Sequence, residues 1–242
     1  MSVNESYYCS CLTAGDLSAE DKQALGGQKA ALLLGAKWPV GGTISLRFLE
    51  GAPELQERVR MVAEEWLKLA NLEFAWRKQG PTDVRIAFKQ GKGSWSYLGN
   101  QCKRIAEPQP TMNYGWLTPT SGDDELRRVV LHEFGHALGL IHEHQNPKGG
   151  GIVWNRDAVI RDLSGPPNNW DEADIENNMF KKYTGVIATD VDDTSIMMYP
   201  IPLAWTRECP AQRHHHRAGQ RFLLHVPRDL PGRGGLSQGM VD

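Results

Sequence analysis

The stretch at residues 131–146, LHEFGHALGLIHEHQN, constrains this chain most, because it contains the pattern H-E-x-x-H-x-x-G-x-x-H. Residues four apart in a helix lie on one face, so His132 and His136 direct two imidazoles toward one point. Gly139 tolerates the left-handed backbone that ends a helix sharply. The chain then turns, and His142 brings a third imidazole to the same point. Three imidazoles and an open position are the donor set of a catalytic zinc site.

Glu133 follows the first of these histidines and is predicted to assist the metal site without being a ligand. Zinc lowers the pKa of a water at its open position, and a neighbouring carboxylate can hold that water and accept its proton. The motif fixes five positions over eleven residues, so it is far more specific than a single histidine. We therefore predict one Zn²⁺ ion on His132, His136 and His142, with Glu133 as the general base.

A second motif, SIMMYP, stands at residues 195–200. Together the two motifs resemble those of the metzincin metalloproteases, and within them the astacin family, over roughly residues 37–205. The resemblance implies that Met197 lies beneath the metal site as a structural residue. It also implies that Tyr199 binds the metal, swings away during catalysis and stabilises the oxyanion. From the residues alone, a plain core tyrosine beside the turn is the preferred interpretation of Tyr199.

The resemblance implies an α+β fold of the metzincin type, with two lobes and a zinc cleft between them. The upper lobe, about residues 37–140, holds a twisted, mostly parallel sheet and two long helices, and the lower lobe, about 141–205, is mostly irregular. The periodicity of apolar residues indicates the individual elements. It predicts strands at 43–49, 72–76, 84–88 and 111–117, a glycine-rich loop at 91–100, helices at 53–71, 155–163 and 171–183, and a zinc helix with a capping-box-like start at 121–124.

Residues 111–117, TMNYGWL, come just before the zinc helix. The resemblance implies that a strand here is an edge strand that pairs with an extended peptide substrate. Strand addition of this kind uses backbone hydrogen bonds, which give affinity without selecting a sequence. Asn113, Tyr114 and Gly115 are therefore the predicted substrate-binding residues. An ordinary edge strand without a binding role is the alternative.

The chain is predicted to have three parts. The last part, residues 206–242, is basic and shows no sustained periodicity of apolar residues. In similar proteins a helix in this region packs on the lower lobe, and no such helix is found in this part of the sequence. A short histidine run at 214–216 is more simply solvated than metal-binding. The three parts are a lead segment and possible pro-segment at 1–36, an astacin-like catalytic domain at 37–205, and a divergent tail at 206–242.

The lead segment invites comparison with the pro-segment of astacins, in which the aspartate of a short F-x-G-D motif caps the zinc. Gly15 and Asp16 match the end of this motif, but Thr13 stands where phenylalanine is expected. An aspartate after a glycine is more simply a turn residue. A zinc-capping thiolate from Cys9 or Cys11 is the chemical alternative.

Glu143 matches the glutamate that meets the new N-terminus of a mature astacin. A cut after Lys29 would free an ammonium at Ala30, and pairing with it would relieve the cost of a buried carboxylate. The preferred alternative is that residues 1–36 stay attached and that Glu143 is exposed or bonds to a neighbouring side chain.

Composition limits the partners. Hydrophobic residues make up 40% of the 242 residues, charged residues 23%, and the net charge is −2. We therefore expect a globular protein without nucleic acid or membrane partners. The resemblance implies protein or peptide substrates, and we expect a monomer. The resemblance suggests secretion, but no secretory signal is visible, so the location is left open. No disulfide is carried over from astacins for Cys9, Cys11, Cys102 and Cys209.

These observations predict a zinc-dependent metalloendopeptidase that hydrolyses internal peptide bonds with a metal-activated water. One alternative is a zinc-stabilised binding module without turnover, which would have no need of Glu133. Another is a variant that folds poorly because of its altered C-terminal tail.

Overall fold

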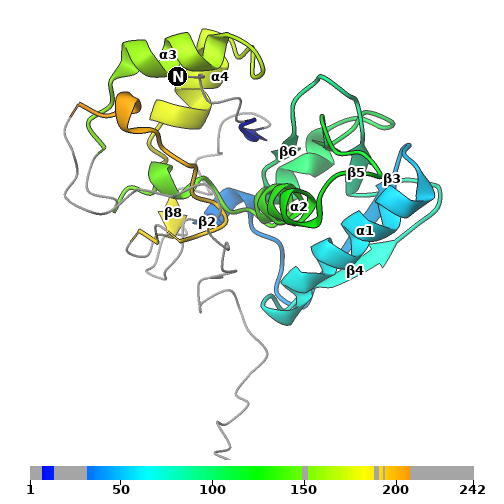
Figure 1. Ribbon diagram of the computed structural model, residues 1–242. Helices are drawn as coiled ribbons and strands as arrows, with labels where there is room; N and C mark the ends of the chain where they lie inside the picture. The colour runs from blue at the N-terminus through cyan, green and yellow to red at the C-terminus, as the bar shows by residue number, and fades with distance from the viewer. Residues whose placement is uncertain (1–6, 14–31, 149–151, 188–190, 193, 208–242) are drawn as a thin grey trace, which may run out of the picture.

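The computed structural model describes residues 7–13, 32–148, 152–187, 191–192 and 194–207, which form two lobes on either side of a central helix, α2 (Figure 1). The helices are α1 (Pro53–Ala63), α2 (Asp123–Ala137), α3 (Arg156–Ser164) and α4 (Glu172–Ile175). The strands are β1 (Ser10–Leu12), β2 (Leu32–Leu33), β3 (Thr43–Phe48), β4 (Glu73–Trp76), β5 (Val84–Ala87), β6 (Trp95–Tyr97), β7 (Met112–Asn113) and β8 (Val186–Ile187). Short 3-10 or π turns are η1 (Leu34–Ala36), η2 (Glu64–Lys68), η3 (Gly99–Arg104), η4 (Glu143–Gln145), η5 (Glu176–Phe180) and η6 (Leu203–Trp205).

The upper lobe contains a six-stranded sheet in the order β1-β6-β7-β5-β3-β4. Neighbouring strands run parallel except for β6 and β7, so the predicted mostly parallel sheet is confirmed. Strands β3, β4 and β5 lie within the three segments whose alternating apolar residues predict strands. In β3 the alternation works as expected, because Ile44 and Leu46 are buried in the core beneath the sheet.

Helix α1 begins at Pro53, whose fixed φ suits a first helical turn. Its apolar stripe buries Leu55 and Val59 against α2. The helix then tightens into η2, which buries Trp66, and the indole of Trp66 donates a hydrogen bond to the carbonyl of Leu131. Helical structure thus ends at Lys68, three residues before the predicted end.

Helix α2 begins without the predicted capping box. Its N-cap is Gly122, and no side chain caps it. The hydroxyl of Ser121 instead accepts a hydrogen bond from the backbone N–H of Thr118. Asp123, Asp124 and Glu125 occupy the first turn, where negative charge favours the positive end of the helix dipole.

The prediction that residues 111–117 form an edge strand is wrong. Only β7 forms there, and it lies inside the sheet between β5 and β6. Asn113 and Tyr114 are completely buried, and the Asn113 amide bonds to the backbone of Lys89 and Gly93. Strand β6 instead comes from the segment predicted as a glycine-rich loop.

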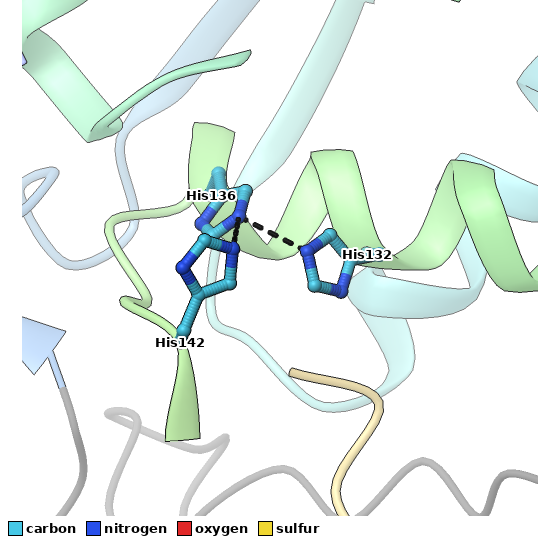
Figure 2. Close-up of side chains that lie close together, drawn as sticks. All are labelled: His132, His136 and His142. Atoms are coloured by element: carbon cyan, nitrogen blue, oxygen red, sulfur yellow. Dashed lines mark hydrogen bonds between the residues drawn. The ribbon is translucent and has the colours of Figure 1, made fainter. Parts of the chain in front are cut away.

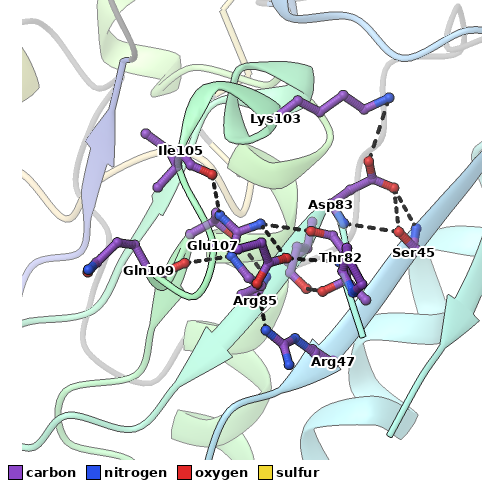
Figure 3. A network of polar contacts seen from close by, with 12 residues as sticks. Ser45, Arg47, Thr82, Asp83, Arg85, Lys103, Ile105, Glu107 and Gln109 are labelled. Atoms are coloured by element: carbon purple, nitrogen blue, oxygen red, sulfur yellow. Dashed lines mark hydrogen bonds and ion pairs between the residues drawn. The ribbon is translucent and has the colours of Figure 1, made fainter. Parts of the chain in front are cut away.

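A polar network fixes one end of this sheet (Figure 3). The buried Arg85 guanidinium donates to the carbonyl oxygens of Thr82, Ile105 and Gln109, at 2.7, 2.8 and 2.6 Å. It also lies 3.4 Å from a carboxylate oxygen of Glu107. Arg85 thereby ties the connection between η3 and β7 to the start of β5.

The lower lobe packs α3, α4 and η5 around an aromatic and aliphatic core (Figure 1). Helix α3 agrees with the predicted helix within a residue at each end. The helix predicted at 171–183 is shorter, since α4 ends at Ile175 and helical structure continues only through the π turn of η5 to Phe180. Within the described ranges, no helix has the length and apolar character needed to cross a membrane.

Candidate active site

Three buried histidines converge at the end of α2 (Figure 2). His132 and His136 lie one turn apart on this helix, and His142 returns from the segment that follows it. The Nε2 atom of His136 lies 3.1 Å from the Nε2 atom of His132 and 3.1 Å from that of His142. The local periodicity of the helix and a sharp exit are therefore sufficient to bring the three rings together.

Gly139 makes that exit. Helix α2 ends at Ala137, and Gly139 has a φ of +104°, a conformation that side chains other than glycine rarely adopt. Its carbonyl accepts a hydrogen bond from the N–H of Leu33, which attaches β2 to the turn. The turn then directs His142 back toward the helix.

The outer nitrogen of each histidine has an acceptor. The Nδ1 atoms of His132 and His136 lie 2.8 Å from the carbonyl oxygens of Ile196 and Leu140, and that of His142 lies 3.0 Å from the Gln145 Oε1 atom. Because these oxygens accept the hydrogen bond, the proton must be on Nδ1 of each ring. Each neutral ring therefore has an unprotonated Nε2 atom with a free lone pair.

Burial keeps these rings neutral, because it lowers the pKa of His136 to about 4 and holds those of His132 and His142 well below the ordinary value. The short Nε2 contacts therefore cannot be hydrogen bonds between the rings, since no proton lies between them. Three converging lone pairs fit a cation, and all three ligand atoms lie within 4.8 Å of one another. The donor set and its compactness fit Zn²⁺.

Glu133 is completely buried next to this cluster. Among the described residues, neither of its carboxylate oxygens has a hydrogen-bond partner of ordinary geometry, although the Cys9 thiol lies nearby and lowers the carboxyl pKa. Burial has the larger effect and raises this pKa well above its usual range. A buried carboxyl without partners is costly, so its position fits a group that handles a water and its proton.

The turn that contains Met197 lies directly against helix α2. A Cβ atom on Gly135 would collide with the Met197 Sδ atom, so the glycine lets the thioether approach the helix backbone. The Met197 N–H donates to the Ser195 hydroxyl, and the Met197 carbonyl accepts from the N–H of Glu143. The turn therefore supports both the helix and the segment that carries His142.

Tyr199 is buried beside the histidines. Its ring centroid lies 5.8 Å from that of His132 and 4.2 Å from that of His142. Its hydroxyl donates a hydrogen bond to the carbonyl oxygen of Cys9. Tyr199 thus contacts both the imidazole rings of the cluster and a peptide group from the start of the described chain.

Residues 7–13, within the lead segment, pass beside the site, with the Cys9 carbonyl at Tyr199 and with Ser10–Leu12 as strand β1. Strand β1 pairs in parallel with β6, with Cys11 opposite Ser96. From the other side, the Asn178 side chain accepts from the Cys11 N–H at 2.8 Å, and the Asn177 side chain donates to the Cys11 carbonyl at 3.1 Å. Sequence reasoning did not predict this strand pairing, although the alternative of a Cys9 or Cys11 thiolate at the zinc placed the same segment at the site, and both cysteines are buried there.

Glu143 is buried and bonds to a neighbouring side chain. One of its carboxylate oxygens accepts from the Asn146 amide at 3.0 Å and from the Asp192 N–H at 3.4 Å, and burial raises its pKa. Lys29 and Ala30, which flank the hypothetical cleavage site, lie outside the described residues. So do Gly15, Asp16, the histidine run at 214–216 and the tail beyond residue 207.

A two-lobed α+β fold with a buried three-histidine centre at the end of its central helix defines a zinc metalloprotease of the metzincin type. The comparison with protein families agrees, since residues 34–200 match the peptidase family described as Astacin. The chain belongs to the astacin family.

Individual relatives agree with this assignment. The chain is 31% identical over 112 residues to zinc metalloproteinase nas-38 of Caenorhabditis elegans, which covers 46% of this chain and 14% of nas-38. It therefore spans only a small part of that relative. A solved structure of myroilysin is 39% identical with a TM-score of 0.68, over 72% of this chain and 85% of that chain. A second myroilysin structure is 33% identical with a TM-score of 0.60, over 90% and 86% of the two chains.

Proposed function

We propose that this protein hydrolyses internal peptide bonds of extended protein substrates, with one Zn²⁺ ion on His132, His136 and His142. The observation that carries this proposal is the extended segment at residues 7–13. It passes beside the three-histidine centre, and its backbone bonds to β6 on one side and to the Asn178 side chain on the other. The segment continues on both sides of the Cys9 peptide group that Tyr199 contacts. A cleft that holds a chain passing through it suits an endopeptidase.

Bound zinc would supply a Lewis acid that lowers the pKa of a water and polarises the substrate carbonyl. Glu133 would accept the proton of the attacking water and deliver it to the nitrogen of the leaving amine. Its buried position without hydrogen-bond partners of ordinary geometry, and its raised pKa, suit a group that takes up and releases a proton within one reaction cycle.

Tyr199 would donate its hydroxyl proton in a hydrogen bond to the oxyanion that develops on the substrate carbonyl. The contact with the Cys9 carbonyl supports this role, because there the same hydroxyl already donates to a peptide carbonyl in the cleft.

Substrate would bind by strand addition to β6, in place of β1. If β1 leaves the sheet, β6 becomes its edge strand. The backbone groups along β6 that now bond to β1 would then be free to bond to a substrate backbone. Asn113, Tyr114 and Gly115 are less suited to this task. Asn113 belongs to β7, which pairs on both sides, and the backbone N–H groups of Tyr114 and Gly115 donate to the Ala87 carbonyl and the Ser94 hydroxyl.

The partners proposed are proteins or peptides that act as substrates, with the enzyme as a monomer that requires neither nucleic acid nor membrane. Secretion is the location that family membership supports. Residues 34–200 match the family, so the catalytic domain is proposed to occupy the predicted range of 37–205.

Casein digestion by the purified chain tests the function, before and after mild proteolysis of the lead segment, with a Glu133→Ala variant as the matched control. We expect fragments from internal cleavage, loss of activity with a chelator, recovery with zinc, and no turnover by the variant despite normal zinc content. A zinc-loaded chain with a free cleft that leaves casein intact would instead favour the non-catalytic binding module. A chain that binds no zinc and shows no cooperative melting would favour the poorly folded variant.

A further inference from the structure

The three zinc-ligating histidines are oriented by different means. His132 and His136 direct Nδ1 to the backbone carbonyls of Ile196 and Leu140. The Nδ1 atom of His142 has a side-chain partner instead, the Gln145 Oε1 atom at 3.0 Å. His142 also lies beyond the end of α2, so the helix does not fix its position. Its orientation therefore depends on a replaceable side chain.

The Gln145 amide has only one orientation compatible with its surroundings. The side chain is completely buried, and its Nε2 atom lies 2.7 Å from the carbonyl oxygen of Asn177 and 3.1 Å from that of Lys181. Carbonyl oxygens only accept hydrogen bonds, so the NH₂ group must face them and Oε1 must face His142. An Oε1 atom also only accepts, and the proton between the two side chains therefore belongs to the imidazole.

We propose that Gln145 is a positioning residue, which holds His142 as the tautomer protonated on Nδ1 and so keeps its Nε2 lone pair directed at the metal. A metal-binding imidazole is generally fixed in this way by the partner of its other nitrogen. This inference rests on the zinc centre of the proposed function, but it does not require turnover.

The same contacts connect the third ligand to the lower lobe. Asn177 belongs to η5 and Lys181 follows it directly, so Gln145 joins the His142 ring to this π turn. The side chains of Asn177 and Asn178 on η5 also hold the backbone of Cys11. One short element therefore supports both the third zinc ligand and the segment that lies in the cleft.

Two substitutions distinguish the effect of Gln145 on the His142 tautomer from its effect on packing. Gln145→Leu keeps much of the volume but removes the acceptor for His142 and the donors for the two carbonyls. Gln145→Glu keeps an acceptor for His142, while a carboxylate oxygen replaces the NH₂ group. We therefore expect Gln145→Leu to bind zinc about 10- to 100-fold more weakly, as is typical when the partner of a metal-ligating histidine is lost. Gln145→Glu should lose less affinity.

The measurements are chelator competition for zinc affinity and nitrogen NMR of the histidine tautomers, both on the full chain and without substrate. In zinc-free protein, His142 should carry its proton on Nδ1 in the wild type and in Gln145→Glu, and should change tautomer in Gln145→Leu. His132 and His136 are internal controls, because their partners are backbone carbonyls. If Gln145→Leu does not fold, Gln145→Glu and the wild type still test the tautomer.

Wild-type zinc affinity and an unchanged His142 tautomer in Gln145→Leu would overturn the proposal. Equal loss of affinity in both variants would also overturn it, since that result assigns Gln145 a packing role alone. Because zinc binding is measured without substrate, a wild-type chain that binds zinc but cleaves no peptide contradicts the proposed function and leaves this inference intact.

Discussion

The hydroxyl of Tyr199 donates a hydrogen bond to the carbonyl oxygen of Cys9, which lies 190 residues earlier in the chain. The side chain proposed to stabilise the reaction is thus bonded to a peptide group of the protein itself. Tyr8 adds to this contact, since its ring packs edge-on against Tyr199 and its hydroxyl donates to the carbonyl of Pro200. Residues 7–13 thus contribute to the burial of Tyr199 and occupy the hydrogen-bonding position of its hydroxyl.

Removal of residues 1–31 should therefore raise peptidase activity. We expect an increase on the order of tenfold or more, because a cleft that is occupied most of the time leaves only a small fraction of molecules free. Initial rates with an internally quenched peptide would measure the effect. The same truncation in a Glu133→Ala background is the control and should stay inactive. Equal rates for the full-length and truncated chains would show that the segment does not limit access.

Tyr199→Phe should lower kcat by about 10²- to 10³-fold with little change in KM, because a donor to the developing oxyanion acts on the barrier more than on substrate binding. Steady-state kinetics on the truncated chain would measure both constants. Tyr183→Phe is the matched control, since Tyr183 is a buried tyrosine in a separate core cluster. A rise in KM alone would assign Tyr199 to ground-state binding.

Arg85→Met should destabilise the upper lobe by roughly 3 kcal/mol, because it removes a buried charged donor from three carbonyls, those of Thr82, Ile105 and Gln109, of which the Thr82 bond is fully buried. Arg47→Met removes the neighbouring ion pair to Glu107, which is partly exposed, and should cost only about 0–1 kcal/mol. Urea denaturation of the two variants would compare them. Similar midpoints for both would contradict the central position of Arg85 in the network of Figure 3.

Alkylation of Cys102 should be slow in the native protein and should rise about tenfold per pH unit from pH 8 to 10. Burial raises the pKa of this thiol to about 12, so the reactive thiolate stays a minor species throughout that range. Mass spectrometry of the Cys102 peptide would follow the reaction, with urea-unfolded protein as the reference. A native rate that reaches a plateau near pH 9, as for an exposed thiol, would contradict the assigned burial.

Local patterns in the sequence determined the metal centre. Helical periodicity places His132 and His136 on one face whatever the rest of the fold does, and Gly139 supplies a turn that few other residues can make. The longer strands and helices were predicted for the same reason, since each displays its own period over enough residues. The capping box failed because Ser121 bonds within its own turn rather than to the helix.

Tertiary structure alone decided the place of β6 in the sheet and the segment that packs beside the three histidines. Strand β6 has three residues, too few to show alternation, and its position beside β7 depends on pairing between distant segments. The burial of residues 7–13 likewise depends on a surface assembled from β6, η5 and Tyr199. The contacts that form a helix join residues a few positions apart, so sequence periodicity predicts them. A strand can pair with segments far away in the chain, so its partner depends on the tertiary structure.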